Sequence, residues 1–306
     1  MRILITGGTG FIGRSLCRAL LKAGHRLTVF SRNPRTVSQK CGAGVAALGS
    51  LSEWTPDRHF DAVVNLAGEP VIGSRWSEQR KRTLWDSRVT LTEHLIERIR
   101  KAEFKPAVLI SGSAVGIYGD RGDAILDESS ATEPDHFGQK LCQAWEYAAW
   151  SAQESGVRVC LLRTGLVIGK GGGFLQKMRL PFTLGLGARL GDGRQWMSWI
   201  HMKDHVAMTQ YLLESPALDG AFNLTAPEPV TNEEFTRCLA RALRRPAVLG
   251  IPAWLIRLGA GEMAELLLGS QRAVPGRFQG ENFKFSYETL DLALRDTLAS
   301  NRDALS

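Results

Sequence analysis

Three glycines near the start of the chain have a spacing that suits the binding of a pyrophosphate. Gly7, Gly10 and Gly13 stand in the stretch ITGGTGFIG, between a short apolar run and a segment with helical periodicity. Glycines at these positions let the backbone turn tightly and approach a phosphate, and the helix N-terminus then offers it unpaired N–H groups. The stretch therefore predicts a dinucleotide site that includes Phe11 and Ile12; the alternative is a plain tight turn.

The residues after the second expected strand indicate which dinucleotide is bound. The stretch HRLTVFSR, residues 25–32, ends in Ser31 and Arg32 and carries no Asp or Glu. A carboxylate at this place binds the ribose 2′-OH of NAD, whereas the 2′-phosphate of NADP suits a guanidinium and a hydroxyl. The pair therefore predicts NADP(H) as the cofactor; the alternative is an exposed loop arginine.

The elements that must position these residues alternate between strands and helices. Apolar runs typical of buried strands alternate with segments that carry an apolar residue every three or four positions. This order predicts an α/β fold with a Rossmann-type, doubly wound parallel sheet that helices cover on both faces. The expected strands are residues 2–6, 25–32, 60–68, 106–114 and 157–169, and the expected helices are residues 11–24, 77–102 and 137–156.

The rhythm of the chain changes near Lys170, where glycine-rich loops and shorter elements begin. We therefore expect an NADP-binding Rossmann domain in residues 1–169, completed by parts of residues 199–226. A smaller C-terminal α/β lobe for the substrate is expected in residues 170–306. Within that lobe, residues 250–300 are expected to form a C-terminal module.

Composition argues against several classes of protein. The chain has 306 residues, 44% hydrophobic and 23% charged, as in soluble globular proteins. Its five cysteines are scattered, which favours a reducing, cytoplasmic setting and argues against a metal site. No apolar run is long enough to span a bilayer, and no secretory signal precedes the first strand. The net charge of +7 includes short, helix-like basic runs, so we expect no nucleic-acid partner; salt-dependent binding of DNA or RNA is the alternative.

Several later stretches resemble one family. The turn NLAG (65–68), the segment SGSAVGIYG (111–119) and the stretches RTGLVIG (163–169) and WIHMKDHV (199–206) are similar to landmarks of the extended short-chain dehydrogenases/reductases, which include nucleotide-sugar epimerases and dehydratases. More narrowly, NLAGEPV and FNLTAPEPVTNEEF resemble an atypical epimerase-like subfamily of the NAD-dependent epimerase/dehydratase superfamily. Some members of that subfamily carry a cell-division-inhibitor label. Residues 269–294 resemble its small C-terminal module.

The resemblance adds residues to the expected cofactor site. In the family, the NLAG turn lies beside the adenosine and ribose, which implies contacts from Leu66, Ala67 and Gly68 here. Glu69 follows at the carboxyl end of the strand, where ligands of α/β proteins bind, and is expected to contact ribose hydroxyls. Arg88, on the helix that follows, is expected to form part of an anion-binding wall in the same region.

The same resemblance implies a catalytic Tyr and a Lys four residues later, and this chain lacks both. Phe137 and Leu141 occupy the two positions, and a phenyl ring has no ionisable atom. A shift of one residue gives His136 and Lys140, but the favoured interpretation is that both lie at an exposed helix start. Ser113 resembles the catalytic serine of the family, with Ser111 as the alternative.

Two further residues are candidates to replace the missing acid. Glu146 follows an apolar-aromatic stretch of the same expected helix, where burial would raise the pKa of a carboxyl group. The favoured alternative is a structural ion pair between Glu146 and Arg163. Tyr118 belongs to a Tyr-Gly pair of the family and is expected to line the cleft.

The second lobe offers basic and aromatic residues that suit an anionic substrate, such as a nucleotide-sugar or another phosphorylated metabolite. The alternative is a lobe whose aromatic residues only pack. The residues in question are Lys170, Lys177, Arg194, Gln195, Trp196 and Trp199. His201 and Asp204 lack a dependable third metal ligand nearby, so we expect a structural hydrogen-bonded group rather than a metal site.

The sequence therefore favours an NADP(H)-binding, epimerase- or reductase-like protein that acts on a small molecule with a relocated acid–base group. The alternative is a non-catalytic NADPH-binding redox sensor or regulator, because the Tyr/Lys pair is missing. The helices expected at 77–102 and 137–156 are also candidates for a homodimer interface. Trp85, Trp145 and Trp150 would make that interface apolar; the alternative places these three residues in the core.

Overall fold

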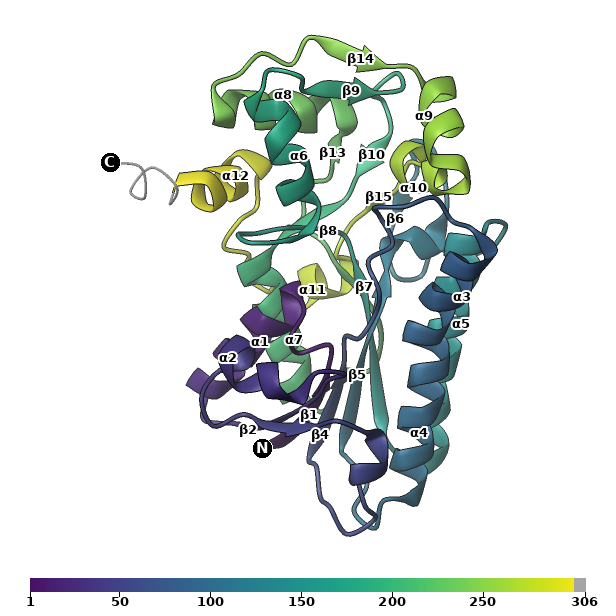
Figure 1. Ribbon diagram of the computed structural model, residues 1–306, viewed down its shortest axis with the longest axis vertical. Coiled ribbons are helices and arrows are strands. Elements are labelled where there is room, and N and C mark those ends of the chain that lie inside the picture. Colours follow the sequence, from purple (N-terminus) through teal and green to yellow (C-terminus); the bar gives the residue numbers. More distant parts are fainter. Residues whose placement is uncertain (300–306) are drawn as a thin grey trace.

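A parallel sheet is the centre of the computed structural model, which describes residues 1–299 (Figure 1). Within these residues the sheet has seven strands in the order β12-β7-β5-β4-β1-β2-β3, and every neighbouring pair is parallel. The strands are β1 (Arg2–Thr6), β2 (Arg26–Phe30), β3 (Ala46–Leu48), β4 (Ala62–Asn65), β5 (Val108–Ala114), β7 (Arg158–Thr164) and β12 (Gly220–Leu224). The predicted Rossmann-type fold is confirmed.

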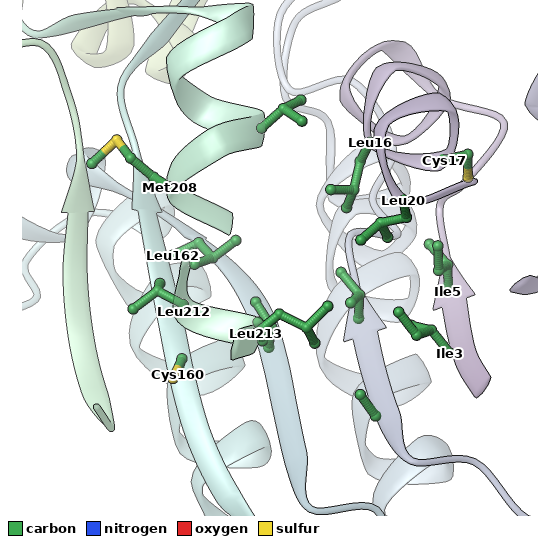
Figure 2. Packing of buried hydrophobic residues seen from close by; sticks show 14 of the residues in the cluster. Ile3, Ile5, Leu16, Cys17, Leu20, Cys160, Leu162, Met208, Leu212 and Leu213 are labelled. Atoms are coloured by element: carbon green, nitrogen blue, oxygen red, sulfur yellow. The ribbon is translucent and has the colours of Figure 1, made fainter. Parts of the chain in front are cut away.

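Helices cover both faces of this sheet because its strands are apolar on both sides. Ile3 and Ile5 of β1 pack against α1 (Phe11–Lys22) and α7 (Met202–Glu214), as Figure 2 shows. Leu4, between them in sequence, faces the opposite side and packs with residues of α4 (Leu91–Lys101) and α5 (Phe137–Trp150). This alternation within one strand produces the doubly wound arrangement.

The helix expected at residues 77–102 is interrupted. It consists of α3 (Glu78–Trp85), a π-helical turn (Asp86–Thr90) and α4. The π-helical turn carries Ser87 and Arg88, which hold the backbone of Glu69 from two sides. Single π-helical turns are frequent at functional sites, and periodicity alone does not reveal them.

The second lobe lies over the carboxyl ends of the central strands (Figure 1). Its strands pair in twos, β8 with β11, β9 with β14 and β10 with β13, and β15 pairs with β6. These short strands are β6 (Ile125–Leu126), β8 (Leu166–Ile168), β9 (Ala188–Leu190), β10 (Trp196–Met197), β11 (Trp199–His201), β13 (Val230–Thr231), β14 (Leu249–Ile251) and β15 (Arg272–Ala273). The remaining helices are α2 (Val37–Cys41), α6 (Gly173–Thr183), α8 (Asn232–Leu243), α9 (Ala253–Ala260), α10 (Glu265–Leu268), α11 (Gly276–Gly280) and α12 (Leu290–Ala299).

Candidate functional site

The turn after β1 is packed too closely for a side chain at Gly7 and at Gly13. Gly7 has φ +70°, and a Cβ atom on it would lie 2.5 Å from the carbonyl carbon of Leu66. A Cβ atom on Gly13 would lie 2.2 Å from the carbonyl oxygen of Gly7. Helix α1 begins after Gly10 without a side-chain cap. Its first N–H groups, and the positive end of its dipole, are therefore available to an anion.

This turn lies where the chain reverses its direction of travel across the sheet. From β1 the chain proceeds to β2 and β3 on one side, and β4, β5 and β7 lie on the other. Such a switch point is where doubly wound sheets bind their ligands. Leu66 and Ala67 follow β4 beside it, and both donate backbone hydrogen bonds to Thr6, at 3.1 and 3.2 Å.

Arg32 and Glu69 meet across the mouth of this site. The Nη2 atom of Arg32 lies 2.8 Å from Oε1 of Glu69, and the Arg32 side chain is 87% exposed. A second arginine, Arg80, lies 3.9 Å from the other oxygen of the same carboxylate. Ser31, the predicted partner of Arg32, accepts a hydrogen bond from the Asn33 N–H at 3.2 Å. The expected ribose contact, Glu69, is thus engaged by the arginine expected to bind phosphate.

Arg88, expected to form part of an anion-binding wall, is packed against the turn that follows β4. Its guanidinium donates to the Glu69 carbonyl at 2.8 Å and lies 5.3 Å from the ring centre of Trp145. Burial lowers the pKa of Arg88. A Cβ atom on Gly68 would lie 2.8 Å from the Arg88 guanidinium carbon, so the turn and the arginine are packed together.

A buried hydrogen-bond hub beneath the turn was missed by the sequence reasoning. Asn65, at the end of β4, accepts from Thr6 at 2.6 Å and donates to Thr92 and Ser111 at 2.8 and 3.2 Å. The indole of Trp145 also donates to Thr92, at 3.1 Å. The hub joins β1, β4, β5, α4 and α5. The signal in the sequence is the polar residue that ends each apolar strand run, ILIT and AVVN.

The glycine-rich loop 169–173 closes over the start of α1. Cβ atoms on Gly172 and Gly173 would lie 2.4 and 2.7 Å from the Phe11 ring, so the loop can approach only because both are glycine. Arg14 donates to the Gly171 carbonyl at 3.3 Å, and Lys177 donates to the carbonyl of Ile72 across the cleft. Phe11 therefore anchors the second lobe at the predicted pyrophosphate site.

The three candidate catalytic residues belong to one buried network. Ser113 donates to Glu146 Oε1 at 2.6 Å, and Arg163 holds both oxygens of Glu146 at 2.9 and 3.0 Å. Arg163 also donates to the Tyr118 hydroxyl at 3.0 Å, which donates to Asn223 at 2.8 Å. All five residues are buried, and burial raises the pKa of Tyr118. The carboxylate of Glu146 is fully engaged in a structural ion pair.

The positions of the family's Tyr and Lys hold apolar residues in the structure as well. Phe137 packs edge-on against Trp76, with ring centres 5.3 Å apart, and Leu141 is buried in the same cluster. His136 and Lys140, one residue away in register, are both exposed. Neither pair places an acid at the cleft.

A cavity of about 220 Å³ lies between the two lobes, beyond the carboxyl ends of β4, β5 and β7. Segments distant in sequence enclose it, and its lining is largely apolar. The lining residues are Val71, Ile72, Ala114, Val115, Gly116, Thr164, Gly165, Leu166, Phe174, Leu190, Trp196, Met197, Ser198, Asn232, Leu266, Leu267, Gly269 and Gln271. Ala114 directly follows Ser113, so the cavity borders the buried network.

The residues expected to cap the cleft have different roles in the structure. Trp196 lines the cavity, and its indole donates to Asp123 at 2.8 Å. Trp199 is fully buried and donates to the Glu228 carbonyl at 2.9 Å, so it is a core residue of the second lobe. Gln195 is also buried and donates to backbone carbonyls. Lys170 and Arg194 are exposed.

Histidines at the start of α7 are buried without a metal-like arrangement. His201 lies 3.4 Å from Asp296, whereas Asp204 accepts hydrogen bonds from the backbone N–H groups of Ser286 and Tyr287. His201 and Asp204 therefore bond to other residues, and the expected bond between them is not formed. Within residues 1–299, no group of three or more His, Cys, Asp or Glu could hold a metal ion. No helix in the same part of the chain is long and apolar enough to cross a membrane.

Comparison with known proteins adds the family. Residues 3–224 match the NAD dependent epimerase/dehydratase family, and residues 251–297 match a domain of unknown function, DUF1731. The chain belongs to the NAD-dependent epimerase/dehydratase family. The epimerase family protein Mb2239 of Mycobacterium bovis is 41% identical over 95% of this chain and 96% of its own length. The epimerase family protein YfhF of Bacillus subtilis is 36% identical over 99% of both.

Solved structures of epimerase-family proteins have the same architecture. The crystal structure of human epimerase family protein SDR39U1 with NADPH matches with a TM-score of 0.87 and 32% identity, covering 98% of this chain and 99% of that one. A UDP-glucuronic acid 4-epimerase from Bacillus cereus in complex with NAD matches with a TM-score of 0.79, full coverage of both chains and 16% identity. The second likeness shows the fold alone, so it does not identify the substrate of this epimerase-family chain.

Proposed function

We propose that the chain binds NADP(H) across the carboxyl ends of β1 and β4 and uses it in a reductase- or epimerase-type reaction on a small molecule. The observation that carries the proposal is the close-packed, uncapped glycine turn with Arg32 at its side. Support comes from the human relative, 32% identical, whose crystal structure contains NADPH. The expectations of no nucleic-acid partner and no membrane partner stay predictions.

Each part of the cofactor has residues suited to it. The N-terminus of α1, reached through Gly7, Gly10 and Gly13, is proposed to hold the pyrophosphate. Ser31 and Arg32 are proposed to bind the 2′-phosphate, because a guanidinium and a hydroxyl match its charge and its acceptor oxygens. When bound, the nicotinamide of the cofactor donates or accepts a hydride.

We propose that Ser113 contacts the substrate oxygen, and this contact requires its single O–H to turn from Glu146 to that oxygen. Glu146 and Arg163 act as positioning residues, because the ion pair fixes the carboxylate that accepts the Ser113 hydroxyl. Tyr118 is hydrogen-bonded within the same network and helps to hold Arg163. With Phe137 in place of the family's tyrosine, the proton for the substrate oxygen comes from solvent.

A second function is favoured by one observation. Within the described residues, the carboxylate expected to replace the missing acid is bound on both oxygens by Arg163. A non-catalytic protein that binds NADPH and signals redox state to a partner needs no free acid. This alternative predicts tight cofactor binding without turnover.

The test is a fluorescence titration of the purified chain with NADPH and with NADH, followed by NADPH oxidation assays on carbonyl compounds. The proposal expects saturable NADPH binding about tenfold tighter than NADH binding, equivalent to about 1.4 kcal/mol. It also expects turnover that falls in Ser113→Ala. Binding without turnover of any compound would favour the sensor, and failure to bind either nucleotide would contradict both functions.

A further inference from the structure

We propose that the cavity between the lobes takes a small, uncharged and mostly apolar carbonyl compound, of the size of a single ring, in place of a nucleotide-sugar. The proposal rests on the proposed function for its chemistry, since a carbonyl is what a hydride reduces. Binding of the compound does not depend on the proposed function, because protein residues alone line the cavity. It also replaces the expectation of an anionic substrate.

The first observation is that the lining of the cavity carries no ionisable side chain. Every residue that encloses it is aliphatic, aromatic, glycine, a hydroxyl or amide residue, or methionine. A phosphate or carboxylate buried there would lose its hydration without gaining a cation. Two cations contact lining residues without being part of the lining: Lys177 is exposed and bonds the Ile72 carbonyl, and Arg272 stacks on Trp196 at 4.2 Å from the ring centre.

The second observation is that the polar side chains of the lining are already engaged by the protein. Ser198 donates to backbone carbonyls, and its oxygen accepts from the Ala273 N–H at 2.8 Å. Thr164 donates to the Leu162 carbonyl at 3.2 Å. Gln271 donates to the Gly119 carbonyl at 3.0 Å, and Asn232 accepts from the Leu190 N–H at 2.8 Å.

A sugar therefore finds few partners in this cavity. A hexose carries several hydroxyl groups, and each would need a hydrogen bond on entering the cavity. The remaining capacity of the amide groups suits one or two polar atoms, as in a ketone or an alcohol. Aliphatic and aromatic side chains would cover the rest of such a ligand.

The third observation is size. The cavity measures about 220 Å³, whereas an apolar cavity of about 150 Å³ in another protein binds benzene. Pockets for drug-sized ligands measure roughly 300–1,000 Å³. The cavity thus accepts a single ring with a short substituent, and a nucleoside diphosphate would have to remain outside it.

The position of the cavity suits reduction of such a compound. Ala114, Val115 and Gly116 border it immediately after Ser113, at the end of β5. In the reductive direction the carbonyl carbon accepts the hydride and forms the new C–H bond. The C=O π bond opens onto oxygen, which takes a proton from solvent, and the products are an alcohol and NADP⁺.

Gly116 allows the cavity to be filled without disturbing its walls. A Cβ atom on this residue would meet nothing within 4 Å, and its φ is not in the left-handed region. Because Gly116 lines the cavity, we expect Gly116→Leu to place its side chain there. Gly280, in α11, is equally unobstructed and exposed, so Gly280→Leu is the matched control.

The experiment measures binding of acetophenone by saturation-transfer NMR on the wild-type chain and on both variants, without cofactor, with UDP-glucose as competitor. We expect acetophenone to bind and UDP-glucose not to displace it. Gly116→Leu is expected to weaken acetophenone binding at least tenfold, or by about 1.4 kcal/mol. Gly280→Leu is expected to leave acetophenone binding unchanged. In a second assay, NADPH oxidation with acetophenone is expected to fall in Gly116→Leu, whereas the NADPH titration is unchanged.

A second variant keeps the test decisive if Gly116→Leu fails to fold. Phe174 lines the cavity and packs edge-on against Phe235, so Phe174→Ala enlarges the space. The variant is expected to bind the larger 2-acetonaphthone more tightly than the wild type does. Lack of acetophenone binding, displacement by UDP-glucose, or binding that neither variant changes would overturn the proposal. Loss of NADPH binding alone would reject the proposed function and leave the cavity assignment standing.

Discussion

Two carboxylates of the site differ in how firmly they are held. Glu69 is paired with Arg32, whose side chain is 87% exposed, and exposed ion pairs contribute about 0–1 kcal/mol. A doubly charged phosphate can therefore take Arg32 away from Glu69. Glu146 and Arg163 are both buried, and removing one partner of such a pair costs roughly 3–5 kcal/mol. A ligand can therefore break the ion pair of Glu69 with Arg32, whereas the ion pair of Glu146 with Arg163 stays intact as part of the folded structure.

Replacing Arg32 is expected to remove the preference for NADPH. In Arg32→Ala the 2′-phosphate loses its guanidinium, so NADPH affinity should fall about tenfold, or 1.4 kcal/mol, while NADH affinity stays the same. The measurement is a fluorescence titration with both nucleotides. Arg35→Ala, three residues away and also exposed, is the control and should change neither affinity. An unchanged preference in Arg32→Ala would refute the phosphate assignment.

Removing Arg163 is expected to destabilise the fold. In Arg163→Met a buried carboxylate at Glu146 loses both hydrogen bonds from its partner, so the free energy of unfolding in urea should fall by about 3–5 kcal/mol. Arg100→Met breaks the exposed pair with Glu154, whose side chain is 69% exposed, and should cost about 0–1 kcal/mol. Equal losses in the two variants would show that the Glu146 pair is not a framework interaction.

At the scale of elements, the site is assembled where β1, β4, β5 and β7 end together. Asn65 ties three of these strands and helix α4 into one buried hub. The π-helical turn between α3 and α4 brings Arg88 beneath the Gly68–Glu69 turn. The glycine turn is therefore supported by hydrogen bonds from several elements. Helix α7 packs beside α1 on the face of the sheet opposite α4.

Two buried histidines, His205 in α7 and His201 at the end of β11, make the stability of the fold depend on pH. His205 is fully buried, and burial lowers its pKa to about 4; burial also lowers the pKa of His201 to about 4. An unfolded histidine has a pKa of about 6.5, so between pH 6.5 and 4 the unfolded chain binds more protons. The stability that depends on neutral histidines is therefore fully present above about pH 6.5. It is lost as pH falls toward 4, by up to about 1.4 kcal/mol per pH unit for each histidine.

The measurement is urea unfolding between pH 7 and pH 4.5 on the wild type and on His205→Gln. We expect a shallower loss of stability in the variant, because one of the two buried histidines no longer titrates. His94→Gln replaces an exposed histidine on α4 and is expected to keep the wild-type slope. The explanation fails if His205→Gln and the wild type lose stability in parallel.

At the scale of the whole molecule, the two lobes close on each other over the cofactor site. Arg14 of the first lobe donates to the backbone of Gly171 in the second lobe. Lys177 of the second lobe donates to the backbone of Ile72 in the first lobe. The outer surface of α4 and α5 lies on the far side of the sheet from α1 and α7 (Figure 1). This surface is the one expected to pair in a homodimer.

We expect the chain to dimerise through α4 and α5 and a variant of that face to be monomeric. Trp145 is buried and Trp85 is 36% exposed, whereas Tyr147 on α5 is 79% exposed. Tyr147→Arg places like charges across a two-fold interface and should shift the mass in light scattering from dimer to monomer. Leu292→Arg on α12 is the control, since this leucine is 50% exposed on another face. A monomeric wild type at micromolar concentration would contradict the prediction.

The sequence by itself determined the fold and the cofactor turn. Alternating strands and helices, and the spacing of Gly7, Gly10 and Gly13, are local patterns, and local patterns decide which segments become strands, helices and tight turns. The absence of Tyr and Lys at positions 137 and 141 was equally plain. Ser31 and Arg32 followed from their place at the end of a strand.

Only the tertiary structure decided what the charged and polar residues do. Glu146 and Arg163 are 17 positions apart, and only the packing of α5 on β7 makes them a bidentate pair. The basic and aromatic residues of the second lobe suggested an anionic substrate, yet the residues that line the cavity carry no charge. A stretch of sequence shows which residue types are present, whereas binding depends on the few side chains that long-range folding brings to one place.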